Sequence, residues 1–281
     1  MLAIIGGTGL YQLERLEVID VTPVATPFGP PSAGVVRGVL AGQEVLFLSR
    51  HGAGHQLLPH EVNYRANIFA LKSMGATQII GISAVGSLSE PIAPGELAIP
   101  SQYFDWTRGR REHTFFGGGL AVHVSTANPV SDALTQWIAQ RAAALDIKLH
   151  TGLTYACVEG PRLGTRAESH FLRQAGCHII GMTNVPEVFL AREAQICYAT
   201  IGIATDYDCW MDDPAKHVKA TEIFGLYRSS LAKVQVLLDS LLAEPRPAEE
   251  PDSRTALQYA MLTPEDALSE QQRDLLAVLR R

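Results

Sequence analysis

The stretch that most constrains this chain is an apolar run, Ile196 to Ala204, that ends abruptly in Thr205-Asp206-Tyr207-Asp208. The run has strand character, and an uncharged strand of this kind is typical of the buried sheet of an α/β protein. Residues i and i+2 at an extended strand end point the same way, so Asp206 and Asp208 can converge on one ligand. Ligands bind at the carboxyl ends of strands in such sheets. The alternative is that both carboxylates are solvated turn residues or helix caps.

Three other predicted strands, in contrast, end in groups that suit an anion. Small residues after a strand leave backbone amides free, hydroxyls can donate, and arginine offers a planar fork of donors that matches phosphate. The strands and the groups that follow them are Leu2–Ile5 with Gly6-Gly7-Thr8-Gly9, Glu44–Ser49 with Arg50-His51, and Gln78–Ile82 with Ser83-Ala84. The first turn lacks the third glycine of a dinucleotide-binding fingerprint. One phosphate held between strand ends explains this repetition better than coincidence.

The rest of the chain alternates between helix and strand patterns, which predicts an α/β fold. Expected helices cover 62–74, 129–145, 165–174, 186–194 and 220–242, and further strands cover 35–40, 96–100, 103–105, 150–158 and 177–182. Residues 107–119, which include three arginines, are expected to form an exposed loop. Residues 244–262 are charged and rich in proline, which is typical of a linker. Thr263 and Pro264 then start a C-terminal helix, 263–281, whose leucines need a surface to cover.

Composition excludes several classes of protein. The chain has 281 residues, 47% of them hydrophobic, which suits one large or two small domains. A net charge of −6 without any run of Lys or Arg argues against a nucleic-acid surface. The sequence has neither a signal-peptide pattern at its N-terminus nor an apolar stretch of about 18 residues, so we expect a cytoplasmic protein without a membrane partner. Its four cysteines have no CxxC or zinc-ligand spacing.

Five motifs together resemble those of the trimeric purine nucleoside phosphorylase superfamily, and most closely its 5′-methylthioadenosine phosphorylase branch. In chain order they are Gly6-Gly7-Thr8-Gly9-Leu10, Arg50-His51-Gly52, Glu159-Gly160-Pro161-Arg162, Met182-Thr183-Asn184-Val185-Pro186-Glu187 and Thr205-Asp206-Tyr207-Asp208-Cys209-Trp210. The resemblance covers residues 1–243. It implies a single-domain, three-layer α/β/α fold, with a twisted mixed β-sheet flanked by helices and a C-terminal helical extension beyond it.

The resemblance also implies an activity. Members of this branch cleave the N-glycosidic bond of 5′-methylthioadenosine with inorganic phosphate, releasing adenine and 5-methylthioribose 1-phosphate. Phosphate is a co-substrate, and no cofactor or metal is expected. The departing purine is a poor anion unless its N7 is protonated or hydrogen-bonded, and a carboxyl group at Asp206 can supply that proton. The family assembles as a homotrimer, which can pair into a hexamer, with one active site at each subunit interface.

Site residues follow from the same resemblance, position by position. Met182 is expected beneath the ribose, Asp206 and Asp208 against the purine, and His123 at the 5′ substituent of a neighbouring subunit. Substrate preference is expected to depend on Leu163, Gly164 and Val218. Leu163-Gly164 stands where the family has Phe-Ser, which removes an aromatic stacking partner for the base. The expected phosphate ligands are Thr8, Arg50, His51, Ser83, Ala84 and Thr183.

Other activities stay open at this point. Phosphorylases that prefer 6-oxopurine nucleosides (methylthioinosine, inosine, guanosine) carry Asn in place of Asp206, because an amide can donate to O6. A hydrolase of the same fold would use water, and the assembled anion-binding set argues against it. A nucleoside-binding protein without catalysis is the remaining alternative.

Overall fold

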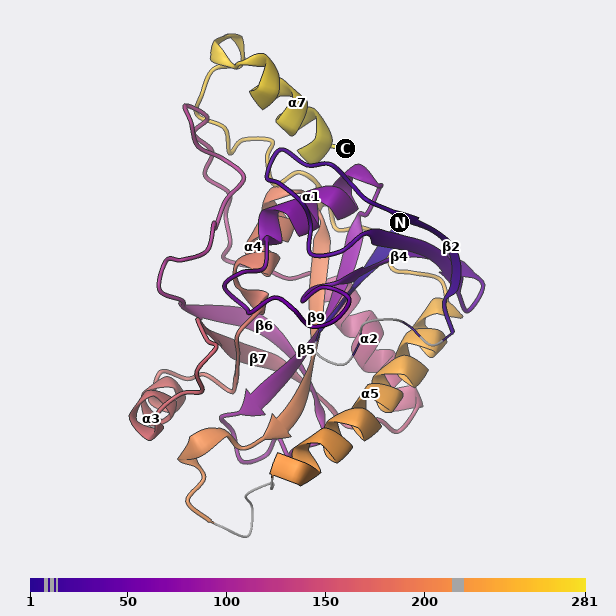
Figure 1. Cartoon of the computed structure of the whole chain (residues 1–281), viewed down its shortest axis with the longest axis vertical. Coiled ribbons are helices and arrows are strands. Elements are labelled where there is room, and N and C mark those ends of the chain that lie inside the picture. Colours follow the sequence, from indigo (N-terminus) through magenta and orange to yellow (C-terminus); the bar gives the residue numbers. More distant parts are fainter. Residues whose placement is uncertain (8–9, 11–12, 14, 214–219) are drawn as a thin grey trace.

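The computed structural model describes residues 1–7, 10, 13, 15–213 and 220–281 (Figure 1). Among these residues, nine strands form one mixed sheet in the order β2-β3-β4-β1-β5-β8-β7-β6-β9. The strands are β1 (Leu2–Gly6), β2 (Glu17–Thr22), β3 (Val35–Leu40), β4 (Gln43–Ser49), β5 (Gln78–Ser87), β6 (Leu97–Trp106), β7 (Leu149–Val158), β8 (Ile179–Gly181) and β9 (Cys197–Asp206). The helices are α1 (Tyr64–Ser73), α2 (Asp132–Ala144), α3 (Arg166–Gln174), α4 (Asn184–Glu193), α5 (Ala220–Leu242), α6 (Pro251–Arg254) and α7 (Glu270–Leu279), with short 3₁₀ turns η1 (Asp208–Trp210) and η3 (Glu265–Ala267).

Half of the sheet closes on itself. Strand β9 pairs in parallel with β5 and antiparallel with β6, so β5, β8, β7, β6 and β9 form a ring of neighbours. The open half is built on β1, which lies between β4 and β5 and is parallel to both. The carboxyl ends of β4, β1, β5 and β9 therefore meet at one edge, as the sequence predicts.

Two apolar layers cover the two faces of the sheet. In β1, Ala3 and Ile5 pack into one cluster with residues of α1, α4 and α7, whereas Leu2 and Ile4 pack into a second cluster with residues of α2 and α5. This alternation is the period of a strand buried on both faces. Figure 1 shows α2 and α5 together on one side of the central strands. The predicted three-layer α/β/α arrangement is confirmed.

Two predicted strands are one strand in the structure. Residues 97–100 and 103–105 belong to the continuous β6, whose pairing with β7 shifts register on both sides of Pro100. Proline has no N–H to give to a ladder, so a bulge absorbs it and the strand continues. A proline inside a strand pattern therefore does not mark the end of this strand.

The C-terminal helix begins later than predicted. Thr263 does not cap it, because the Thr263 hydroxyl accepts from Ala121 N and donates to Gly119 O, which binds the tail to another segment. Ser269 caps α7 instead, in a capping box with Gln272. The buried leucines of this tail (Leu268, Leu276, Leu279) join the apolar cluster of α1, so the surface they cover belongs to their own chain.

The stretch 244–262 lies against the domain. It contains α6, and the carbonyl oxygen of Pro247 accepts a hydrogen bond from Gln78 Nε2. In the described ranges, no helix combines the length and the apolar character needed to cross a membrane.

Candidate active site

The candidate site lies where strand β5 exchanges one partner strand for another. Strand β5 pairs with β1 as far as Gly81 and with β8 from Gly86, while β9 accompanies it on the other side throughout. Between Gly81 and Gly86, one side of β5 has no strand partner among the described residues. A cavity of about 370 Å³ lies at this gap. The sequence predicts a strand over 78–82. In the structure this strand, β5, continues to Ser87 and carries Ser83 and Ala84 along the cavity wall.

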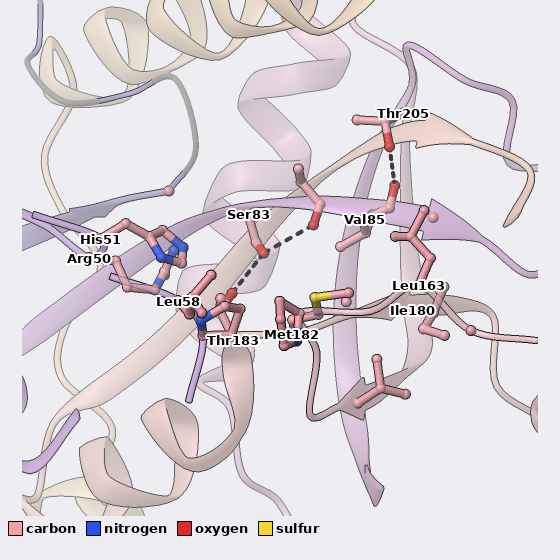
Figure 2. A pocket seen from close by; sticks show the side chains of 18 of the residues that line it. Arg50, His51, Leu58, Ser83, Val85, Leu163, Ile180, Met182, Thr183 and Thr205 are labelled. Carbon is pink, nitrogen blue, oxygen red and sulfur yellow. Dashed lines mark hydrogen bonds between the residues drawn. The ribbon is translucent and has the colours of Figure 1, made fainter. Parts of the chain in front are cut away.

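Most of the predicted site residues line this single cavity. Figure 2 shows Arg50, His51 and Thr183 toward one end and Leu163 toward the other. The predicted residues that line it are Arg50, His51, Ser83, Ala84, Leu163, Gly164, Met182, Thr183, Asp206 and Asp208. Thr8 and Val218 lie outside the described residues. His123 does not line the cavity of its own chain; it is exposed, and its backbone N–H donates to Ala260 O.

Arg50 does not present its whole guanidinium group to the cavity. Its side chain is fully buried, and Nε and Nη2 donate to the two carboxylate oxygens of Glu187 at 2.6 and 2.7 Å. Nη1 donates to Ile82 O at 2.8 Å. Burial alone would lower the pKa of Arg50, but the adjacent Glu187 carboxylate outweighs it and raises that pKa. The sequence predicts a fork open to an anion; in the structure only the remaining N–H groups are available.

His51 is neutral in this environment. Burial, together with the neighbouring Arg50 charge, lowers the pKa of His51 to about 4. Its Nδ1 lies 2.9 Å from Leu57 O. Because a carbonyl oxygen only accepts, Nδ1 carries the proton and Nε2 is left as an acceptor.

Two hydroxyls lie side by side on the cavity wall. Ser83 Oγ and Thr183 Oγ1 are 3.1 Å apart, and the dashed line in Figure 2 marks this contact. Thr183 precedes α4, yet its side chain makes no capping hydrogen bond to that helix. The Ser83 hydroxyl also reaches Ala84 O, over a longer 3.3 Å. Both hydroxyls can exchange these contacts for an oxyanion between them.

Asp206 and Asp208 both line the cavity, but they do not lie on one extended strand as predicted. Only Asp206 belongs to the strand; Asp208 starts the 3₁₀ turn η1 with a positive φ of 47°. Asp206 Oδ1 accepts from the Thr205 hydroxyl at 2.6 Å, and Oδ2 accepts from Asp208 N at 2.9 Å. Burial, with a smaller contribution from Asp206, raises the pKa of Asp208. The two carboxylates converge because the chain turns, not because the strand continues.

Arg111 is a residue whose role the sequence does not reveal. It lies in the loop predicted to be exposed, but its side chain is buried and pairs with Glu159, with Nε 3.0 Å from Oε1. Arg111 Nη1 also donates to Val185 O at 2.6 Å. It therefore ties the loop that carries Leu163 to the segment that follows Thr183. An arginine among other loop arginines gives no signal of this role.

The base of the Glu159–Gly164 loop requires a glycine. Gly160 has a φ of 66°, and a Cβ there would lie 2.5 Å from the sulfur of Met182. A side chain at this position would displace Met182 from the cavity wall. Further along the loop, Leu163 is 81% exposed at the rim of the cavity.

The fold is that of the nucleoside phosphorylases. The family described as the phosphorylase superfamily matches residues 1–243. The S-methyl-5′-thioadenosine phosphorylase of Geobacter sulfurreducens is 42% identical over 99% of this chain and 97% of its own length. The enzyme of that name from Hyperthermus butylicus is 46% identical over 89% of this chain and 90% of its own. The chain belongs to the phosphorylase superfamily.

Solved structures agree with this assignment. A methylthioadenosine phosphorylase from an antarctic soil metagenomic library has a TM-score of 0.90 and 42% identity, covering 99% of this chain and 98% of that one. The Schistosoma mansoni methylthioadenosine phosphorylase in complex with adenine has a TM-score of 0.86 and 33% identity, covering 93% and 98%.

Proposed function

We propose that this protein cleaves 5′-methylthioadenosine with inorganic phosphate, giving adenine and 5-methylthioribose 1-phosphate. The observation that carries the proposal is one cavity lined both by the neighbouring hydroxyls of Ser83 and Thr183 and by the two carboxyl groups of Asp206 and Asp208. A nucleoside that spans them places its glycosidic bond between the two. The relatives and neighbours named above, which carry the name of this activity, support the choice of nucleoside.

The phosphate end of the cavity positions the anion through hydrogen bonds and carries little net positive charge. Arg50 is neutralised by Glu187, and the imidazole of His51 is uncharged. Hydroxyl and N–H donors therefore hold the anion. Phosphate is itself the nucleophile, so the protein's task there is to hold it in line with C1′ as the base departs. Thr8 and Ala84 complete the proposed phosphate set.

At the base end, the carboxyl groups stabilise the departing purine. Asp206 faces the base, and burial of the neighbouring Asp208 raises the pKa of Asp208, which favours the protonated form of that carboxyl group. A proton or hydrogen bond at N7 lowers the barrier to departure, and carboxylate lone pairs also accept from the 6-amino group of adenine. No metal or redox cofactor has a part in this scheme.

The assembly belongs to the proposal as well. We propose a homotrimer, able to pair into a hexamer, in which His123 reaches the 5′ substituent in the neighbouring subunit and Val218 contributes to the 5′ pocket. The exposed position of His123, outside its own cavity, supports this role. The remaining parts of the proposal are a cytoplasmic location and the division of the chain into a catalytic domain (1–243), a linker (244–262) and a C-terminal helix (263–281).

One assay tests the activity. Adenine release from 5′-methylthioadenosine is measured with and without phosphate, with inosine as the comparison substrate. We expect release that requires phosphate and is at least about tenfold faster than release of hypoxanthine. Adenine release without phosphate would indicate a hydrolase, hypoxanthine release alone would indicate a 6-oxopurine enzyme, and binding without turnover would indicate a nucleoside-binding protein.

A further inference from the structure

We propose that Glu187 is a positioning residue for phosphate, because it fixes the orientation in which Arg50 meets the anion. This inference rests on the proposed function and deepens it. Glu187 lies on α4 and does not line the cavity, whereas Arg50 follows β4 and does. The contact joins positions 137 residues apart in the chain.

Glu187 determines which donors of Arg50 remain free. A guanidinium group has five N–H bonds. Nε and one N–H of Nη2 bind Glu187, and one N–H of Nη1 binds Ile82 O. One N–H on each terminal nitrogen is left. Nη1 lies against Gly7, where a Cβ would come within 3.1 Å of it, and Gly7 lines the cavity.

Glu187 is in turn held by a buried hydroxyl. Tyr198 Oη donates to Glu187 Oε1 at 2.7 Å. The same hydroxyl accepts from Asn184 Nδ2 at 3.0 Å and from Thr200 Oγ1 at 2.8 Å. Asn184 directly follows Thr183, so one buried network links the Arg50 side of the phosphate end to the Thr183 side.

The surrounding backbone leaves room for this network. A Cβ on Gly81 would lie 2.6 Å from Tyr198 Oη and 3.2 Å from Glu187 Oε1, so only glycine fits there. A buried ion pair adds little stability compared with well-packed apolar residues. A bidentate pair does restrict the rotation of arginine, which is what a phosphate site requires.

Glu187→Gln tests the inference. The amide oxygen can accept from one nitrogen of Arg50, but the amide NH₂ then faces the second donor, so the fork must shift. We expect the KM for phosphate to rise at least about tenfold, the loss that one charge-assisted hydrogen bond predicts. The KM for 5′-methylthioadenosine should stay within about twofold, and calorimetric titration with inorganic phosphate alone should show the same weakening.

Glu193→Gln is the matched control. Glu193 lies on the same helix and also accepts two hydrogen bonds, but from Thr114 and Phe115 rather than from Arg50. This variant should leave the KM for phosphate within about twofold. A purely structural role for Glu187 would change both KM values or neither.

Tyr198→Phe keeps the test decisive if Glu187→Gln does not fold. It removes the hydroxyl that donates to Glu187 and accepts from Asn184 and Thr200, but it leaves the Glu187 carboxylate on Arg50. We therefore expect a smaller rise in the KM for phosphate, about two- to fivefold. An unchanged or lowered KM for phosphate in the variant that folds would overturn the inference. Failure of the proposed function would appear separately, as wild-type protein without phosphate-dependent turnover.

Discussion

The backbone N–H of Asp208 donates to Oδ2 of Asp206 over 2.9 Å, so the first carboxylate of the pair shapes the turn that places the second. The Thr205 hydroxyl occupies the other oxygen, Oδ1, at 2.6 Å. The Asp208 N–H can only donate, whereas the Thr205 hydroxyl, which also lies 3.2 Å from Val85 O, can donate or accept. An Asn at this position can therefore accept from Asp208 N with its amide oxygen and donate to the Thr205 hydroxyl with its NH₂, which keeps the turn.

Asp206→Asn should keep the local turn but change both the rate of turnover and the choice of base. We expect kcat/KM for 5′-methylthioadenosine to fall at least about tenfold and the ratio of 6-oxopurine to 6-aminopurine turnover to rise about 10- to 100-fold, because the amide donates to O6. Steady-state kinetics with methylthioadenosine and inosine measure the ratio. Thr205→Val, which leaves the carboxylate in place, should keep the original preference. An unchanged ratio in Asp206→Asn would refute the role given to this carboxyl group.

The C-terminal helix should contribute to the stability of its own chain. Leu279 has no exposed surface and lies in the same apolar cluster as residues of α1. Leu279→Ala should lower the free energy of unfolding by about 3 kcal/mol, since a buried leucine leaves a cavity when it is truncated. Leu262→Ala is the control, because Leu262 is 66% exposed and should cost less than about 0.5 kcal/mol. Urea denaturation measures both, and equal effects would contradict this packing.

The strand ends could be predicted from the sequence because their signal is local. Each apolar run stops at a polar or glycine-rich group. That pattern and the family motifs predict Ser83, Arg50 and Asp206 at one site, and all three line the cavity. The sheet edge then brings them together, whatever the loops between them do.

The partners of these groups could not be predicted, because each is distant in the chain. Nothing near Arg50 indicates that Glu187 neutralises it, and nothing near Glu159 indicates Arg111. The turn at Asp208 is also hidden, since aspartate tolerates a positive φ without any accompanying glycine. The sequence predicts which side chains reach the site, while the contacts that orient them depend on packing.

His51 should make the protein sensitive to mild acid. Its pKa is about 4 in the folded protein and about 6.5 when unfolded, so between these values the unfolded chain binds more protons. Stability should therefore fall as the pH drops from 6.5 to 4, by up to about 3 kcal/mol from this group. His51→Asn keeps a donor for Leu57 O but cannot titrate, so this slope should be absent from it. Urea unfolding in buffers without phosphate compares the two, and parallel pH profiles would contradict a buried neutral imidazole.

Glu193 should have the opposite effect on the pH dependence of stability, over nearly the same range of pH. Burial raises the pKa of Glu193 to about 7, although the Phe115 N–H and the Thr114 hydroxyl both donate to its carboxylate. Between pH 4.5 and 7 the folded protein binds more protons than the unfolded chain, so stability from this group is present at low pH and is lost as the pH rises through 7. Glu193→Gln stays neutral, and its stability relative to wild type should rise by about 2 kcal/mol between pH 5 and pH 8. A constant difference across that range would show that Glu193 is already ionised at pH 5.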